Sequence, residues 1–318
     1  MQRDSRGKLL AAVVGAIALV AAACTGQADQ VEEVHVSFAS FDVAVGEDQR
    51  ILAGLRTSEA AIIAFGEVEF ALAFLGDEPT EEVPVSQMST ARFLPVPGAE
   101  PEPEGAEPHP RALTGQPGVG LYSARVDLNR PGRWALQVTA DLGDGRSLQG
   151  TTIFMVLDEP LVPTVGDAAP RVANLTIADV ETGNAPAYAV DSRAGSADGS
   201  IPAPLLHTTS IPEALDARQR MVIAVTTPVY CVSQFCGPLT NVMADMAETY
   251  APDIAFVHIE VWHDFENAQL TDAAAAWIQT EIGGNEPWVF VVDADGTIVA
   301  RWDNVLDVNE LEQLLAAW

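Results

Sequence analysis

The segment 221-MVIAVTTPVYCVSQFCGPLT-240 decides how the C-terminal part of the chain folds. Its first residues, 221–226, form an apolar run with β-branched side chains and predict a buried strand. Two cysteines follow, Cys231 and Cys236, and residues 239–250 then show the helical spacing of apolar side chains. The sequence therefore predicts a cysteine pair between the end of a strand and the start of a helix.

The flanking residues continue this alternation of strands and helices. Upstream, residues 211–218 predict a helix with Ser210 as its N-cap and Pro212 in its first turn. Downstream, the pattern predicts a strand at 254–261, a helix at 272–282, a hairpin around Asp295-Gly296 and a closing helix at 308–318. The order α-β-α-β-α-β-β-α indicates an α/β domain at 207–318.

This order of elements resembles the thioredoxin-like family. The resemblance rests on the strand before the cysteines, the helix after them, and Glu286-Pro287 before the next strand, where that family keeps a cis-proline facing the cysteines. It implies that Cys231 is the nucleophile, that Cys236 resolves the mixed disulfide, and that Pro287 shapes the substrate groove. Two features depart from the family. The spacing is Cys-x4-Cys, so Cys236 can also be aligned with the nucleophile, and residues 221–227 lack the family's buried acid.

Three interpretations of the cysteine pair stay open. The first is thiol–disulfide exchange, and the second is a structural disulfide in a non-catalytic surface binding or scaffold protein. The third follows from a resemblance to Sco-type copper chaperones, with Cys231, Cys236, His258 and His263 as candidate metal ligands, although that family's histidine comes much later in the chain. The sequence leaves open whether the protein is an enzyme, and we predict no other cofactor.

The N-terminus predicts export and lipid anchoring. A basic head precedes an apolar run at 9–23, which is too short to span a bilayer but suits a secretory signal. The ending Val20-Ala-Ala-Ala-Cys24 resembles a bacterial lipobox, and removing Cys24 leaves an even pair of cysteines. We expect a lipoprotein signal peptide at 1–23, lipidation of Cys24, a tether at 24–34, and a place on the extracytoplasmic face of the cell membrane. An ordinary signal peptide with an incidental cysteine is the alternative.

Residues 35–159 carry the signals of an all-β domain. Short strands alternate with turn signals such as Asn129-Arg-Pro-Gly132, which favours an antiparallel β-sandwich. The stretch from Gly120 to Val126, followed by Pro131-Gly-Arg-Trp134, resembles immunoglobulin-like (Ig-like) extracytoplasmic domains. Within this domain, residues 95–118 predict a disordered loop rich in Pro, Glu and Gly, and residues 160–206 predict a linker.

Composition limits the class of partner. The 318 residues include 45 Asp and Glu against 16 Lys and Arg, which gives a formal net charge of −29. A surface this acidic repels phosphate backbones, so we expect no nucleic-acid binding. The predicted fold class is multi-domain, an N-terminal all-β Ig-like sandwich plus a C-terminal α/β thioredoxin-like domain. We expect a monomer whose partners are exported proteins with thiols or disulfides and, through the lipid anchor, the membrane.

Overall fold

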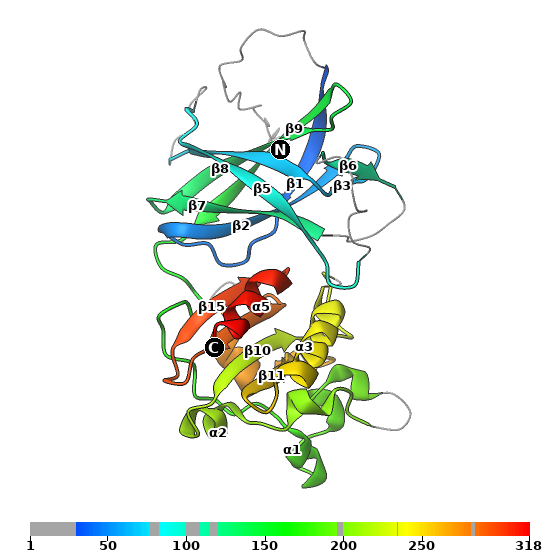
Figure 1. Ribbon diagram of the computed structural model, residues 1–318, viewed down its shortest axis with the longest axis vertical. Helices are drawn as coiled ribbons and strands as arrows, with labels where there is room; N and C mark the ends of the chain where they lie inside the picture. The colour runs from blue at the N-terminus through cyan, green and yellow to red at the C-terminus, as the bar shows by residue number, and fades with distance from the viewer. Residues whose placement is uncertain are drawn as a thin grey trace, which may run out of the picture.

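The computed structural model describes residues 30–76, 83–99, 109–114, 120–195, 200–233, 235–280 and 284–318. The predicted signal peptide and Cys24 lie outside these residues, as do 100–108 and 115–118 of the predicted loop. A large N-terminal sheet lies above a C-terminal part that holds a smaller sheet and the helices (Figure 1). Within the described chain, no helix is both long enough and apolar enough to cross a membrane.

Seven N-terminal strands close into a barrel. They are β1 (Gln30–Phe38), β2 (Gly46–Thr57), β4 (Glu67–Phe74), β5 (Gln87–Pro95), β7 (Gly120–Leu128), β8 (Gly132–Asp141) and β9 (Arg146–Val156). Their order is β1-β9-β8-β4-β5-β7-β2, and β1 pairs with β2 to complete the ring. The short strands β3 (Ile62–Ala64) and β6 (Arg111–Leu113) extend the sheet from β2, so β6 lies inside the segment predicted as a loop.

Strand β1 closes the barrel because its two halves pair with different neighbours. Residues 30–33 run parallel to β9, and residues 34–38 run antiparallel to β2. A glycine permits this crossing, since a Cβ at Gly150 of β9 would collide with the carbonyl oxygen of Val34. The barrel interior is filled by large buried side chains such as Phe70, Tyr122 and Trp134. Closure of the barrel thus depends on the close approach of the β1 and β9 backbones at Gly150 as well as on the apolar core.

The C-terminal part is built on a four-stranded sheet of order β11-β10-β14-β15. Its strands are β10 (Arg220–Thr226), β11 (Ile254–Glu260), β14 (Trp288–Val292) and β15 (Ile298–Asp303). Strands β10 and β11 are parallel, whereas β14 is antiparallel to both β10 and β15. Apolar side chains of α3 (Cys236–Tyr250) and α5 (Val308–Ala316) pack in one core cluster with the sheet, and those of α2 (Ile211–Asp216) and α4 (Asp272–Ile278) pack in another.

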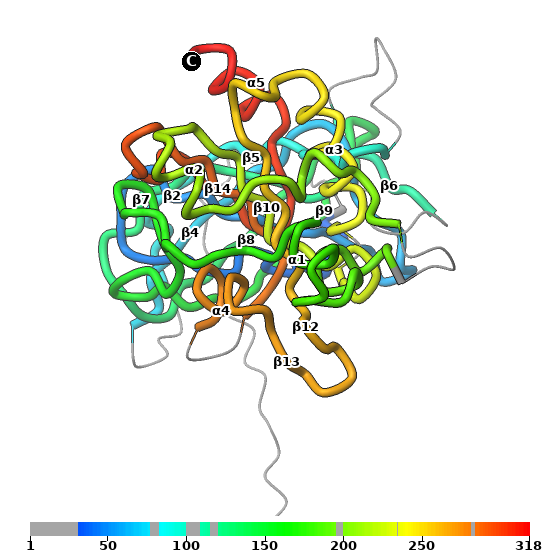
Figure 2. The backbone as a smooth tube through the Cα atoms, turned by 90° about the horizontal axis from the view of Figure 1, so that it is seen from below, coloured from blue at the N-terminus to red at the C-terminus, as the bar shows by residue number. Residues whose placement is uncertain are grey.

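Short helices occupy the segment between the barrel and this sheet. They are α1 (Ile177–Glu181) and the single-turn 3-10 helices η1 (Ala187–Ala189), η2 (Ser192–Gly195) and η3 (Pro204–His207). η3 contacts both β11 and α3, so the end of the predicted linker is packed against the sheet. A separate hairpin, β12 (Trp262–Asp264) and β13 (Gln269–Leu270), projects from the side of the molecule (Figure 2).

The predicted fold class is wrong. The N-terminal part is a closed barrel and not an Ig-like sandwich, because β1 joins β9 to β2 and leaves no separate second sheet. No α/β thioredoxin-like domain is evident either. The described chain is predominantly β, and of its five α-helices only α3 is longer than nine residues. Alternating apolar residues occur equally in sandwiches and barrels, and the local order of elements does not determine a family fold.

A buried ion pair joins the barrel to the C-terminal sheet. Arg50 of β2 lies 3.0 Å from Asp303 at the end of β15, and both side chains are almost fully buried. Arg50 also donates to the carbonyl oxygen of Val305, and the Asp303 carboxylate accepts a 2.7 Å hydrogen bond from the Phe41 N–H. Burial lowers the pKa of Arg50 below its usual value, and the charge of Asp303 opposes that shift. The pair therefore fixes the end of β15 against two segments of the barrel.

Removing one member of this pair should destabilise the protein strongly. We expect Arg50→Ala to lower the free energy of unfolding by about 3–5 kcal/mol, because Asp303 then stays buried without its counter-charge. Urea denaturation followed by circular dichroism measures the change. The matched control is Arg146→Ala, whose partner Asp144 is exposed and whose loss should cost less than about 1 kcal/mol. Equal sensitivity of the two variants to urea would contradict the role given to Arg50.

Candidate functional site

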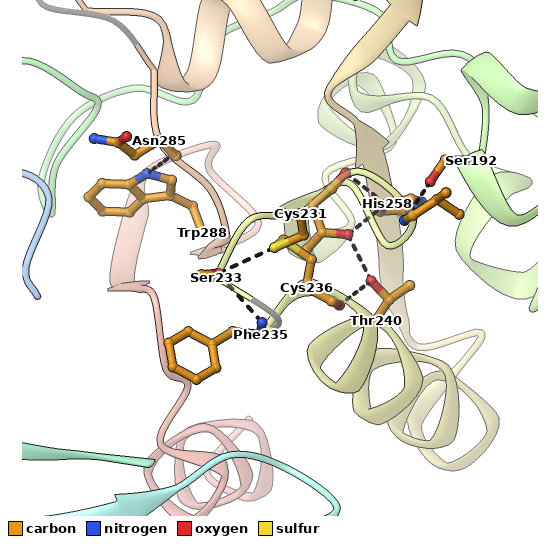
Figure 3. The surroundings of a disulfide bond; sticks show 11 residues. Ser192, Cys231, Ser233, Phe235, Cys236, Thr240, His258, Asn285 and Trp288 are labelled. Atoms are coloured by element: carbon orange, nitrogen blue, oxygen red, sulfur yellow. Dashed lines mark hydrogen bonds between the residues drawn. A yellow bond between two sulfur atoms is a disulfide. The ribbon is translucent and has the colours of Figure 1, made fainter. Parts of the chain in front are cut away.

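Cys231 and Cys236 form a disulfide at the end of the loop that follows β10 (Figure 3). Strand β10 ends at Thr226, and Pro228 follows, which has no N–H for a ladder hydrogen bond. Cys236 is the first residue of α3, and Pro238 occupies the first turn, where a helix needs no N–H. The loop thus places one cysteine before the helix and the other at its first position.

The two cysteines differ in exposure. Cys236 is completely buried, whereas Cys231 is half-buried and its sulfur lies 3.2 Å from the hydroxyl of Ser233. A thiolate arriving from solvent therefore has access to Cys231 and not to Cys236.

The start of α3 is suited to a negative charge on Cys236. No described side chain caps this helix, and its first turn holds no acidic residue. The unpaired N–H groups at a helix start and the helix dipole together place partial positive charge there. Such an environment lowers the pKa of a thiol and stabilises the thiolate.

The loop around Cys231 is apolar and uncharged. Val232 is 93% exposed, and Val229 is also exposed. Tyr230 stacks on Phe265 of the projecting hairpin with ring centroids 4.1 Å apart. Residues 221–244 contain no charged side chain, although the whole chain carries a formal charge of −29. A partner therefore meets apolar side chains and no charged residue of this loop beside the half-buried Cys231.

The other predicted site residues have distinct positions. The Glu286–Pro287 peptide bond is cis, Pro287 is buried, and its carbonyl oxygen accepts a 2.9 Å hydrogen bond from the Asn304 N–H. Asn285 and Trp288, which flank this bond, belong to the surroundings of the disulfide (Figure 3). Of the two histidines, His258 is buried in β11, and His263 is exposed on β12.

A line of hydrogen bonds connects Cys236 with His258 (Figure 3). The Thr240 hydroxyl donates to the Cys236 carbonyl oxygen at 2.8 Å, and it lies 2.7 Å from the Thr226 hydroxyl. Because Thr240 has one proton, Thr226 must be the donor in their shared bond. His258 Nε2 lies 2.8 Å from that same Thr226 hydroxyl and 3.3 Å from the Thr226 carbonyl oxygen. Nε2 therefore carries the proton, and Nδ1 of His258 has a free lone pair.

Nδ1 of His258 faces a buried polar cluster that sequence reasoning missed. Asp191 and His207 are fully buried beside it, and Arg193 binds the Asp191 carboxylate through its guanidinium at 2.6 Å. Burial and the neighbouring His207 lower the pKa of His258 to about 3, so the ring is neutral. Burial also opposes ionisation of Asp191, but the closeness of His207 and Arg193 outweighs it and holds the pKa of that carboxyl well below its usual value. His207 has no motif around it and Asp191 begins a Ser- and Gly-rich run, so no local pattern indicated the cluster.

Glu260 supports the loop that leads to Cys231. Its carboxylate accepts a 2.8 Å hydrogen bond from the Ser192 N–H, and the Ser192 hydroxyl accepts one of 3.2 Å from the Val229 N–H. Burial raises the pKa of Glu260 to about 7, and the hydrogen bonds from Thr227 and Ser192 moderate that rise. The group thus changes charge near neutral pH just below the cysteine loop.

Comparisons with known proteins do not place the chain in a family. No family model matches, and no curated protein matches. One similar solved structure is described as "Crystal structure of MtrC from Shewanella baltica OS185" and is 12% identical. The match covers 84% of this chain and 51% of that chain, with a TM-score of 0.24. The chain spans about half the length of the solved protein, and the likeness carries no argument. The predicted assignment to the thioredoxin-like family is wrong, because the described chain is predominantly β with a closed barrel and shows no thioredoxin-like α/β fold.

The raised pKa of Glu260 predicts a pH dependence of stability. The unfolded carboxyl titrates near 4.5 and the folded one near 7, so the folded state keeps a proton that the unfolded state has released between these values. The free energy of unfolding should then fall by about 3 kcal/mol as the pH rises through this window. Glu260→Gln has no carboxyl to ionise, so its free energy of unfolding should not fall in this way. Its stability relative to the unmodified protein should therefore increase as the pH rises.

Urea denaturation across the same pH window measures the difference. Glu266→Gln is the matched control, because Glu266 is exposed, and its stability should run parallel to that of the unmodified protein. A constant difference between Glu260→Gln and the unmodified protein at every pH would show that Glu260 is ionised throughout.

Proposed function

We propose that this protein exchanges disulfides with the thiols of partner proteins through Cys231 and Cys236. The observation that carries the proposal is the unequal burial of the two cysteines. Cys231 is half-buried within an exposed apolar loop, and Cys236 is fully buried at the first position of α3. A structural disulfide needs no such inequality, whereas exchange requires one sulfur that a partner can attack and one that can leave.

The reaction follows from this geometry. A partner thiolate attacks the sulfur of Cys231, the bond between Cys231 and Cys236 breaks, and Cys236 leaves as a thiolate stabilised by the start of α3. A second partner thiolate then attacks the partner sulfur of the mixed disulfide and releases Cys231 as a thiolate. The partner loses two electrons and gains a disulfide, and this chain gains the two electrons as two thiols. The reverse sequence reduces a partner disulfide.

The substrate class follows from the rim of the site. Val229, Tyr230 and Val232 flank Cys231 in the loop, which itself carries no charged side chain, and Tyr230 stacks on the exposed Phe265. This surface suits an extended, cysteine-bearing polypeptide with apolar neighbours more than a charged small thiol. We further propose that these partners are exported proteins and that a lipid on Cys24 holds the chain at the outer face of the membrane. An oxidising compartment is where protein disulfides form and persist.

The reduction potential of the pair tests the proposal directly. Working oxidoreductases have potentials of about −120 to −270 mV, whereas structural disulfides lie below about −300 mV. We expect a value in the first range, measured by thiol alkylation and mass shift after equilibration with glutathione buffers. A value below about −300 mV would mean that the disulfide is structural and would overturn the exchange function.

Single-cysteine variants test the assigned roles. Cys236→Ser leaves the accessible Cys231 thiol and should form mixed disulfides with a thiol-reactive peptide disulfide. Cys231→Ser leaves only the buried thiol of the pair and should react at least about tenfold more slowly. Both variants carry a Cys24→Ser background, so that no other thiol contributes. Equal rates, or a faster Cys231→Ser variant, would reverse or remove the assignment of Cys231 as the attacked residue.

A further inference from the structure

The buried cluster beside His258 joins side chains from three separate elements. Asp191 precedes η2, His207 is the last residue of η3, and His258 lies in β11. All three are at most 1% exposed, and one ligand atom from each lies within 4.8 Å of the others. The shared carboxylate oxygen of Asp191 lies 3.3 Å from His207 Nε2 and 3.9 Å from His258 Nδ1.

The polar atoms of this cluster lack the partners that burial demands. Among the described residues, neither Nδ1 of His207 nor Nδ1 of His258 has a hydrogen-bond partner, and Nε2 of His207 has the Asp191 carboxylate 3.3 Å away. The tautomer of His258 adds to the unmet hydrogen-bonding capacity of the cluster. Thr226 fixes the proton on Nε2, so the lone pair on Nδ1 faces the carboxylate of Asp191. Buried polar groups are normally satisfied, so a histidine lone pair that faces a carboxylate with no proton between them suits a bound cation.

We infer that Asp191, His207 and His258 form a site for a divalent transition-metal ion of the zinc class, with three protein ligands and one open position. Ions of this class bind imidazole nitrogen and carboxylate oxygen at about 2.0–2.2 Å, which places tetrahedral ligand atoms about 3.3 Å apart. The separations of 3.3 and 3.9 Å are close to that spacing. Two nitrogens and one oxygen suit Zn²⁺ or its neighbours, whereas Mg²⁺ and Ca²⁺ require more oxygen ligands.

The surroundings supply the outer contacts that metal sites use. Thr226 holds the His258 ring through Nε2, and Arg193 holds the Asp191 carboxylate through two of its nitrogens. Because Arg193 already neutralises Asp191, we expect weaker affinity than at structural zinc sites with thiolate ligands. Arg193 also lines a surface cavity of about 400 Å³ whose rim carries Asp245 and Glu248. These carboxylates attract cations to the side of the cluster that Arg193 separates from solvent.

The first experiment uses the full chain in its disulfide form, with any free thiol alkylated, so that no cysteine can be a ligand. The protein is stripped with a chelator and then dialysed against Zn²⁺ with a large excess of Mg²⁺, which occupies the many surface carboxylates. We expect one retained equivalent of Zn²⁺ by elemental analysis and a higher melting temperature in its presence. Retention of no zinc would overturn the site.

Substitutions locate the ion. His207→Gln should lower the affinity by at least about tenfold, whereas the exposed His263→Gln should retain the full equivalent. Equal binding by these two variants would place the ion elsewhere and overturn the inference. Should His207→Gln not fold, the Co²⁺ spectrum of the unmodified protein decides. Strong visible bands of a four-coordinate site without a thiolate band support the cluster, and the weak bands of a six-coordinate ion refute it. The site uses neither cysteine, so its failure leaves the exchange reaction untouched.

Discussion

The buried pair of Arg50 and Asp303 is the contact on which the relation between the barrel and the C-terminal sheet depends. Each charge is desolvated, so either one is tolerated only while the other is present. Arg50 belongs to β2 of the barrel, and Asp303 is the last residue of β15. In the C-terminal sheet, β14 lies between β15 and β10 and pairs with both. Since the cysteine loop follows β10, this ion pair helps to position the disulfide relative to the barrel, together with the buried pair of Arg301 and Asp42.

The barrel also contacts the cysteine loop directly. Phe235, the residue before Cys236, packs against a buried apolar cluster that combines side chains of β2, β5 and β7 with Val305, namely Leu52, Leu94, Leu121 and Val305. The end of the loop nearest α3 is therefore covered by barrel side chains, whereas Val229 and Val232 remain exposed. The residue before Cys236 is thus covered by packing between parts of the chain that are far apart in sequence. A C-terminal part without its barrel would leave Phe235 without the leucines that it packs with.

Local patterns in the sequence predicted the elements around the disulfide but not the fold. Ser210 caps α2 and Pro212 lies in its first turn, as the capping signals predicted. The apolar run before the cysteines forms β10. Both signals act within one turn or one strand, so they can be read from the local sequence. The closure of the barrel depends on Gly150 lying against Val34, a long-range contact that alternation does not encode. The cluster beside His258 was not predicted from the sequence for the same reason. Asp191 lies in a segment whose composition predicts a linker, and only tertiary packing brings it to β11.

Hydrogen bonds connect the two proposed sites at two places. One is the bond from the Val229 N–H of the cysteine loop to Ser192, the residue after Asp191. The other is a line of hydroxyl groups, and the energy of its bonds limits what it can transmit. Thr240 binds the carbonyl oxygen of Cys236, and Thr226 joins Thr240 to the ring of His258. A change in the first turn of α3 on reduction can reach the ring of His258 through these hydroxyls. Linkage then requires a reciprocal effect, so the factor by which an ion changes the reduction equilibrium equals the factor by which reduction changes the ion's affinity. One neutral hydrogen bond is worth about 1 kcal/mol, which corresponds to a factor of roughly five. The line of hydroxyls can therefore change the reduction equilibrium or the ion affinity by a small factor, but it is too weak for one site to turn the other on or off.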